Sequence, residues 1–164
     1  MPTPVSNSSP PWRAGTGFDS HAFAPGIPLR LGGVTIAHTH GLAGHSDGDV
    51  LLHAVCDAIL GALALGDIGA LFPPGDAQWR NADSRVFVRR AYELMREAGW
   101  SVGNLDATLI LEQPRLGPCR DSIRASLADL LSTGIEAISI KAKTPEGLNW
   151  PGTAVAQVTV LLYR

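Results

Sequence analysis

The segment from Asp47 to about Ala64 constrains the fold most strongly, because its pattern predicts a long and largely buried helix. Ser46, followed three residues later by Asp49, resembles a capping box at the start of this segment. A helix with a broad apolar face must pack against a second apolar layer, so the chain needs a sheet or other helices to cover it. The apolar residues that recur at helical spacing are Val50, Leu51, Ala54, Ile59 and Leu63.

Patterns elsewhere in the chain predict that a β-sheet forms the second layer. A second helix is predicted from about Ser84 to Gly99, and a third over Asp121–Leu131. Because helices separate the strands, the simplest arrangement is an α+β fold with one mixed β-sheet and helices packed on one face. Apolar or alternating runs predict a hairpin over Leu29–Ile36 and strands over Trp12–Asp19, Leu105–Leu111, Ile138–Lys143 and Val155–Tyr163.

Length and composition predict one domain without a strongly charged surface. The chain has 164 residues, 45% of them hydrophobic and 17% charged, and a formal net charge of -2. It has no basic run and no apolar stretch of about 18 residues, which argues against nucleic-acid binding and against a membrane span. We therefore expect a single domain over residues 12–164, preceded by a flexible tail rich in proline and serine over residues 1–11.

The tail and the cysteines indicate a cytoplasmic location. The first eleven residues lack the basic and apolar segments of a signal peptide. The two cysteines, Cys56 and Cys119, give neither a disulfide framework nor a metal-ligand spacing. We expect both thiols to be reduced.

All five histidines fall within residues 21–53, and this clustering is the first sign of function. Asp19 and His21 are two residues apart at the end of a predicted strand, so their side chains point the same way, while His53 lies in the predicted helix. One carboxylate and two imidazoles could converge and leave a fourth position open, which is typical of a catalytic zinc or similar divalent ion. The alternative is that these are ordinary core or surface histidines.

Two acids flank His53 on one side of the predicted helix. Asp49, His53 and Asp57 are spaced four residues apart, so either acid could orient the imidazole ring. Alternatively, Asp49 only stabilises the helix N-terminus electrostatically.

Two segments could bind an anion such as phosphate. The segment Gly41–Gly48 would place His45 and Ser46 at a helix N-terminus, where backbone amides point outward. Lys141–Gly147 combines lysines with a threonine. Glycines in loops are commonly plain turns, and the acidic turn Gly66–Gly69 is explained most simply as the end of the first helix.

Taken together, these residues resemble one family, the 2-C-methyl-D-erythritol 2,4-cyclodiphosphate synthases of the non-mevalonate isoprenoid pathway. The resemblance extends from about Arg13 to the end of the chain. It implies a ferredoxin-like α/β sandwich and a homotrimer whose active sites lie between neighbouring subunits. The motifs that carry it, in chain order, are Gly17-Phe18-Asp19-Ser20-His21, the run Gly41 to His53, Leu65-Gly66-Asp67-Ile68-Gly69, Leu71-Phe72-Pro73, Ala82-Asp83-Ser84-Arg85 and Gly103-Asn104-Leu105-Asp106.

The resemblance also implies a metal-dependent lyase reaction. The 2-phosphate of 4-diphosphocytidyl-2-C-methyl-D-erythritol 2-phosphate would attack the β-phosphorus, forming 2-C-methyl-D-erythritol 2,4-cyclodiphosphate and releasing CMP. Asp19, His21 and His53 would bind one divalent metal per subunit, zinc or alternatively manganese, and magnesium would bridge the substrate phosphates beside Glu146. Such a reaction depends on positioning and charge neutralisation more than on covalent catalysis.

The same resemblance implies roles for residues outside the metal triad. His45 and Ser46 would hold the attacking phosphate, and Thr144 and Glu146 would complete the catalytic group. Two further residues, Asp67 and Gly69, would bind the methylerythritol hydroxyls. The cytidine would lie against residues of two segments, namely Leu111, Pro114, Arg115, Leu116, Ala142, Lys143 and Thr144.

The chain departs from the family pattern over Asn149–Thr153, where Thr153 stands at a position that is frequently arginine. Because that arginine helps to hold phosphate, a second hypothesis is a non-catalytic trimer that binds metal and cytidine nucleotide. A third is a zinc hydrolase of other phosphoesters, which would need a water-activating base. Pro74, where aspartate often follows the Phe-Pro pair, is a smaller departure.

Overall fold

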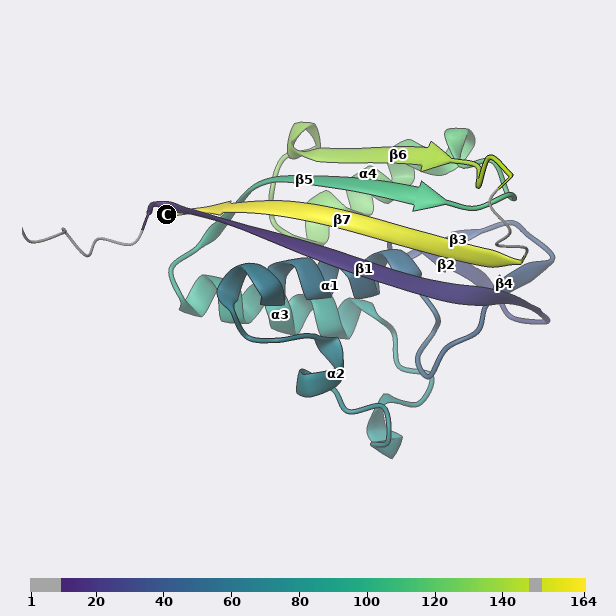
Figure 1. The fold of residues 1–164 in the computed structure, drawn as a ribbon, viewed down its shortest axis with the longest axis horizontal. Coiled ribbons are helices and arrows are strands. Elements are labelled where there is room, and N and C mark those ends of the chain that lie inside the picture. The colour runs from purple at the N-terminus through teal and green to yellow at the C-terminus, as the bar shows by residue number, and fades with distance from the viewer. Residues whose placement is uncertain (1–9, 148–151) are drawn as a thin grey trace, which may run out of the picture.

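The computed structural model describes residues 10–147 and 152–164, which form a two-layer arrangement of a β-sheet and helices (Figure 1). The long helices and strands follow the predicted order, which is strands, two helices, a strand, a helix and two strands. In chain order the elements are β1 (Trp12–Pro25), β2 (Leu29–Leu31), β3 (Val34–Ile36), β4 (His40–Leu42), α1 (Val50–Leu63), α2 (Ile68–Leu71), a 3-10 turn (Ala77–Trp79), α3 (Arg85–Glu97), β5 (Ser101–Ile110), a 3-10 turn (Gly117–Cys119), α4 (Arg120–Leu130), a 3-10 turn (Ile135–Ala137), β6 (Ile138–Lys143) and β7 (Thr153–Tyr163).

Five strands form one mixed sheet in the order β4-β1-β7-β5-β6. The long central pair, β1 and β7, runs antiparallel from Trp12 opposite Tyr163 to Ala22 opposite Thr153. β5 is antiparallel to β7 and parallel to β6, so the β5–β6 pair requires the crossover through α4. The hairpin β2–β3 forms a separate two-stranded sheet.

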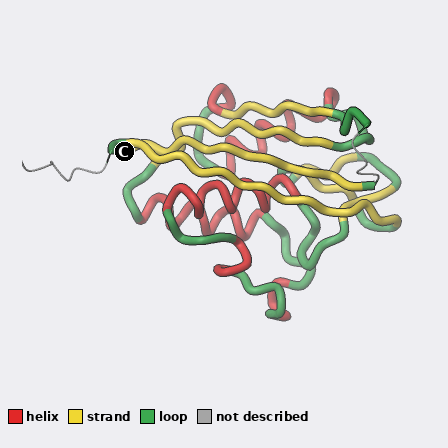
Figure 2. Tube along the Cα trace, viewed as in Figure 1, coloured by secondary structure: helices red, strands yellow, loops and turns green. Residues whose placement is uncertain are grey.

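The helices lie on one face of this sheet, and the other face is open (Figure 2). β7 shows this arrangement, because apart from the buried Val155 its buried residues alternate with exposed ones, so one side of the strand is covered. On the open face, Phe18 is 61% exposed and Tyr163 is 53% exposed. The predicted mixed sheet with helices on one face is therefore confirmed. The buried series in β7 is Ala154, Ala156, Val158, Val160 and Leu162.

Two glycines of β1 let this strand lie unusually close to α1. A Cβ atom at Gly17 would lie 1.9 Å from the carbonyl oxygen of Ala54, and one at Gly15 would lie 2.0 Å from that of Ala58. No side chain can be accommodated at such distances, so only glycine permits this packing. The close approach brings the end of β1 beside the first turns of α1.

The start of α1 differs from the predicted capping box. Asp49, not Ser46, is the N-cap residue, and its carboxylate accepts a hydrogen bond from the backbone N–H of Leu52 at 3.0 Å. The same carboxylate accepts the backbone N–H groups of Gly32 and Gly33 in the β2–β3 turn at 2.9 and 2.7 Å. Asp49 therefore joins the hairpin to the helix, a contact between distant segments that spacing alone does not indicate.

The other predicted helices and strands are present in the structure, with some differences in their bounds. β1 continues six residues past the predicted end at Asp19, and α2 and β4 lie in segments for which no element was predicted. Within the described residues, no helix combines the length and apolar character needed to cross a bilayer. Residues 1–9 of the predicted tail, and residues 149–151 of the divergent segment, lie outside the described residues.

Candidate metal centre

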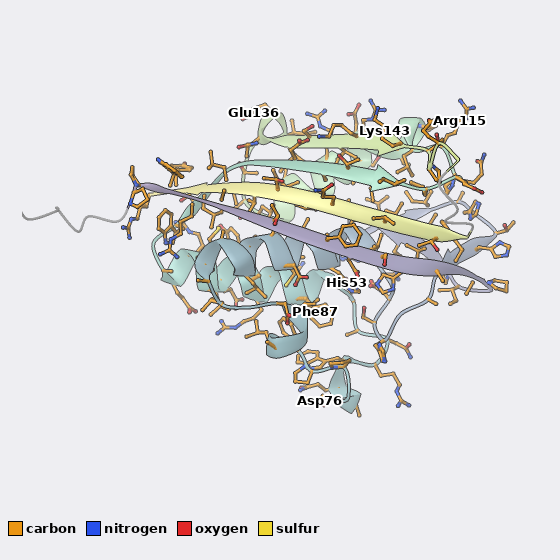
Figure 3. All side chains as sticks on the ribbon, in the orientation of Figure 1. His53, Asp76, Phe87, Arg115, Glu136 and Lys143 are labelled. Atoms are coloured by element: carbon orange, nitrogen blue, oxygen red, sulfur yellow. The ribbon has the colours of Figure 1, made fainter. Side chains whose placement is uncertain are left out.

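The predicted triad of one carboxylate and two imidazoles is brought together where β1 passes α1. Asp19 Oδ2 lies 2.9 Å from both His21 Nε2 and His53 Nδ1. The two ring nitrogens are 3.1 Å apart. Asp19 and His21 belong to β1 and His53 to α1, and one ligand atom of each lies within 4.8 Å of the others. Figure 3 labels His53 on α1. The convergence expected from their spacing is therefore present.

The donor atoms fit a divalent metal ion. Two imidazole nitrogens and one carboxylate oxygen form the mixed set that zinc and similar ions accept, and such a set leaves a fourth position for a substrate oxygen. With metal–ligand distances of about 2.0–2.1 Å, the edges of a tetrahedral site are about 3.3 Å long. The three donor atoms already lie within a few tenths of an ångström of that spacing.

The electrostatics of the triad favour a charged carboxylate. Burial opposes the ionisation of Asp19, but hydrogen bonds from His21 and His53 outweigh it and hold the pKa of Asp19 well below its usual value. The hydrogen bond to Asp19 in turn raises the pKa of His21 above its usual value, although burial works against this. The site therefore keeps a negative charge that attracts a cation.

The far side of the His53 ring contacts two serines. His53 Nε2 lies 2.9 Å from Ser46 Oγ and 2.9 Å from Ser84 Oγ. Neither acid that was expected to orient the ring does so: the Asp49 carboxylate is taken by three backbone N–H groups, and Asp57 accepts the backbone N–H of Ile68 at 2.7 Å. Of the two alternatives for Asp49, the structure therefore supports the role at the helix N-terminus. Neither acid orients the ring, because hydrogen bonds from backbone groups take both carboxylates.

The triad lies in the wall of a cavity of about 200 Å³. His45 and Ser46 line the same cavity, and so does Gly69. His45 and Ser46 belong to the loop before α1, and Gly69 belongs to α2. Because α1 begins only at Val50, His45 and Ser46 do not lie at its N-terminus, where the sequence had suggested. Asp67 caps α2 by accepting the backbone N–H of Ala70 at 2.8 Å.

Three aromatic rings form a cluster in the lining of the same cavity. The Phe72 and Phe87 ring centroids are 4.7 Å apart, and Trp79 lies 5.1 Å from Phe72. All three line the cavity, and Phe87 also approaches the ring of His53 at 6.1 Å between centroids. Sequence reasoning missed Trp79, which stands in a segment without periodicity. The lining of the cavity therefore combines the charged triad with an apolar aromatic cluster.

The residues expected at the cytidine form a second group, outside this cavity. The ends of β5 and β6 are in register, and the backbone N–H of Leu111 donates to the carbonyl of Lys143 at 3.1 Å. This contact brings the segments 111–116 and 142–144 together, and Arg115 and Lys143 lie near each other and away from His53 (Figure 3). Leu111 and Leu116 are buried, whereas Arg115, Lys143 and Thr144 are exposed and Pro114 and Ala142 are half-buried.

The exposed turn after β6 holds the remaining predicted catalytic pair. The hydroxyl of Thr144 donates a hydrogen bond to the Glu146 carboxylate. Neither residue lines the cavity of the metal triad. Within one chain, the structure therefore brings together the metal half of the predicted site but leaves the nucleotide half apart.

Comparison with known proteins identifies the family. The sequence model described as the YgbB family matches residues 12–163. The chain belongs to the YgbB family. The resemblance found in the sequence is thus confirmed over almost its whole length.

Relatives of this YgbB-family chain carry one name. The protein named 2-C-methyl-D-erythritol 2,4-cyclodiphosphate synthase in Koribacter versatilis (strain Ellin345) is 59% identical over 152 residues, which cover 93% of this chain and 98% of the relative. The protein of that name in Xanthomonas axonopodis pv. citri (strain 306) is 53% identical over 156 residues, covering 93% and 94%. A solved 2C-methyl-D-erythritol-2,4-cyclodiphosphate synthase in a CDP-bound form is 42% identical, with a TM-score of 0.86 over 92% of this chain and 99% of that one.

Proposed function

We propose that this protein is a lyase that cyclises 4-diphosphocytidyl-2-C-methyl-D-erythritol 2-phosphate in isoprenoid precursor biosynthesis. An oxygen of the 2-phosphate attacks the β-phosphorus, the bond from that phosphorus to the α-phosphate oxygen breaks, and CMP leaves. The observation that carries the proposal is the convergence of Asp19, His21 and His53 at a cavity with His45 and Ser46. Relatives at 53% and 59% identity over most of the chain bear the name of this activity.

Asp19, His21 and His53 would hold one divalent ion, for which we propose zinc, with manganese as the alternative. Such an ion, when bound, supplies positive charge to a phosphate oxygen. Asp19 keeps its charge because its two histidine partners stabilise the carboxylate. Each imidazole must present an unprotonated nitrogen to the ion. The hydrogen bond made by the other ring nitrogen determines which of the two nitrogens is unprotonated.

The other residues of the cavity would position the substrate. His45 and Ser46 lie in the wall beside the triad, where they can hold the attacking 2-phosphate. We assign Asp67 and Gly69, at the start of α2, to the methylerythritol hydroxyls. The aromatic cluster of Phe72, Trp79 and Phe87 limits the access of water to the reacting phosphates. No side-chain nucleophile is needed for this transfer.

We propose a homotrimer in which a neighbouring copy supplies the nucleotide half of each site. Two observations support this: the cytidine segments lie apart from the cavity of the same chain, and the open sheet face exposes apolar side chains such as Trp12, Phe18 and Tyr163. Thr144 and Glu146 would come from that neighbour, with magnesium bridging the phosphates beside Glu146. Residues 12–164 would act as one domain, and the two-layer fold is compatible with a ferredoxin-like sandwich.

The two other hypotheses are less well supported. A non-catalytic trimer would explain the divergent Asn149–Thr153 segment, but the high identity to named synthases over most of the chain does not favour it. A hydrolase of other phosphoesters needs a general base for water near the open metal position. Asp57, the further acid in the cavity, is committed to the backbone N–H of Ile68.

Phosphorus NMR of the purified protein with the diphosphocytidyl 2-phosphate substrate and magnesium tests the proposal. We expect a cyclic diphosphate and CMP to appear together, and to be lost when zinc is first removed with a chelator and restored when zinc is returned. A sample of free CMP and inorganic phosphate serves as the reference for simple hydrolysis. Bound but unchanged substrate would support the non-catalytic trimer instead.

A further inference from the structure

Ser84 stands at the N-cap position of α3 but does not cap that helix. Its side chain makes no capping hydrogen bond, and the residue is fully buried. A serine at this position normally contributes about 0.5–2 kcal/mol by capping. The helix start is held instead by Asp83, whose carboxylate accepts the backbone N–H of Arg85 at 3.0 Å. The hydroxyl of Ser84 is therefore committed to another contact.

That contact joins Asp47 to His53. The Ser84 hydroxyl donates to Asp47 Oδ1 at 2.5 Å, and the Ser84 backbone N–H donates to Asp47 Oδ2 at 3.2 Å. On its other side, Ser84 Oγ lies 2.9 Å from His53 Nε2. A carboxylate, a hydroxyl and an imidazole thus form a chain that ends at the metal triad.

The direction of the protons in this chain follows from its members. A hydroxyl has one proton, and the Asp47 carboxylate can only accept, so Ser84 must donate to it. The Ser84 oxygen is then left to accept, so a hydrogen on His53 Nε2 satisfies the contact between them. Ser46 Oγ also lies 2.9 Å from Nε2, and it can accept from Nε2 while its own hydroxyl donates to Ser84, so both serines are compatible with this direction. A neutral imidazole with hydrogen on Nε2 has its lone pair on Nδ1, the atom that faces Asp19 and His21.

Two neighbouring groups hold this chain in place. Ser46 Oγ lies 3.2 Å from Ser84 Oγ, so its hydroxyl can donate to the same oxygen. A terminal nitrogen of Arg30, on β2, lies 3.7 Å from carboxylate oxygens of both Asp47 and Asp83 and helps to hold the Asp47 side chain in place.

We propose that Ser84 and Asp47 are a positioning pair that selects the His53 tautomer with its proton on Nε2, so that Nδ1 is free to bind the metal. The inference rests on the metal site of the proposed function. Neither residue touches the expected metal or substrate, and both act through the histidine ring. Without the pair, the carboxylate of Asp19 can draw the proton onto Nδ1, the nitrogen that the metal needs.

Zinc affinity, measured by competition with a fluorescent chelator, gives the first test. Loss of such an outer hydrogen bond typically weakens metal binding by about 10–100-fold, and we expect a loss in this range for Ser84→Ala. Ser126→Ala is the matched control, because it also removes a serine hydroxyl that donates a hydrogen bond, here to the carbonyl of Gly32 at 2.6 Å, and has no contact with Asp47 or His53. The control should lower the thermal midpoint and leave the zinc affinity unchanged. Equal zinc affinities for Ser84→Ala and the wild type would overturn the proposal.

The second test reads the tautomer itself in the metal-free protein. Nitrogen-15 NMR of the histidine rings, at a pH where they are neutral, should show His53 with hydrogen on Nε2 in the wild type and on Nδ1 in Ser84→Ala. Asp47→Asn should shift the same equilibrium in part, and Ser84→Thr, which keeps the hydroxyl, should restore it. A wild-type ring with hydrogen on Nδ1 contradicts the proposal.

The two readouts also separate this inference from the proposed function. A wild type that binds no zinc but shows the Nε2–H tautomer would contradict the proposed metal site and leave the pairing of Ser84 with His53 supported. If the wild type and Ser84→Ala bind zinc equally tightly, the proposed metal site is supported and the pairing of Ser84 with His53 is contradicted. If Ser84→Ala does not fold, Asp47→Asn decides the question by the same measurements.

Discussion

The two halves of the proposed active site are built in different ways. The metal half lies where a strand and a helix pack so closely that only glycine fits between them, and its three donor atoms are within 3.1 Å of one another. The nucleotide half lies at the ends of β5 and β6, where Arg115 and Lys143 are exposed. One half is preformed within a single chain, whereas the other is an open surface.

This difference indicates what each half needs from the rest of the protein. The metal ligands need a rigid core, because a small displacement of β1 from α1 separates the donor atoms. The nucleotide segments need a second surface to close over the ligand, since an exposed loop cannot by itself exclude water from the phosphates. Substitutions of the metal ligands should therefore have large effects, and so should a substitution of Glu146, proposed to lie beside the magnesium ion. A substitution of an exposed side chain that only contacts the cytidine should have a small effect.

The largest effect is expected for His53→Ala. The variant loses one of three metal ligands, and since a bound metal contributes several kcal/mol to charge stabilisation, turnover should fall by about 1,000-fold. Metal content by mass spectrometry and CMP release by chromatography measure both consequences. His40→Ala, at a histidine outside the cavity, is the control and should keep its metal. A full complement of tightly held metal in His53→Ala would falsify the ligand assignment.

Gly17→Ala should disrupt the metal half from a distance. Its Cβ would lie 1.9 Å from the carbonyl oxygen of Ala54, so β1 must move away from α1 at a cost of about 1–3 kcal/mol, the usual range for overpacking. Urea denaturation measures the loss, and zinc affinity should fall with it. Gly75→Ala, where nothing lies within 4 Å of the added atom, is the matched control. Equal stability of the two variants would contradict the close packing described above.

Zinc affinity should weaken progressively in acid. Metal binding requires neutral imidazoles, and the hydrogen bond to Asp19 raises the pKa of His21 above its usual value of about 6.5. Protonation of His21 therefore begins at a higher pH than for a free histidine, and it opposes binding more strongly as the pH falls. The pKa of Asp19 is lowered, so its carboxylate remains charged over this range. Competition titrations between pH 8 and 5 should show at least about a tenfold loss per pH unit at the acid end; a flat profile would exclude His21 as a ligand.

The smallest effect is expected for Arg115→Ala. The side chain is exposed, and exposed charged contacts are worth about 0.2–1 kcal/mol, so the KM for the substrate should rise by less than about fivefold with kcat nearly unchanged. Steady-state kinetics compare this variant with Arg89→Ala, an exposed arginine on α3. A loss of kcat as large as that of His53→Ala would contradict the expected difference between the metal half and the cytidine contacts in their effect on turnover.

The sequence predicted the sheet, the main helices and the Asp19–His21 pair because each depends on short-range spacing. Spacing left open whether His53 joins that pair, and the resemblance to the family supplied the full triad. The alternation in β7 and the Asp-x-His pair on β1 can be recognised without knowing any distant contact. Membership of the family supplied the cytidine residues, whose exposed positions carry no pattern of their own.

Contacts between distant segments could not be predicted in this way. Asp49, not Ser46, caps the helix, and its carboxylate also accepts two backbone N–H groups from the β2–β3 turn. That turn is distant in the sequence, so spacing does not indicate the contact. In the helix predicted from about Ser84, the apolar Val86 is 44% exposed, while the neighbouring Phe87 and Val88 fill the core. Ser84 stood in a recognised motif, yet its role is visible only once α3 is placed beside His53.

A mixing experiment tests most directly whether the two halves of each site come from different chains. His53→Ala, inactive in the metal half, and Glu146→Gln, impaired in the nucleotide half, are unfolded and refolded together in equal amounts. If each site combines halves from neighbouring subunits, random assembly restores about one quarter of the sites, and CMP release should recover to about that fraction of the wild-type rate. Recovery no greater than the sum of the separate variants would contradict a shared site.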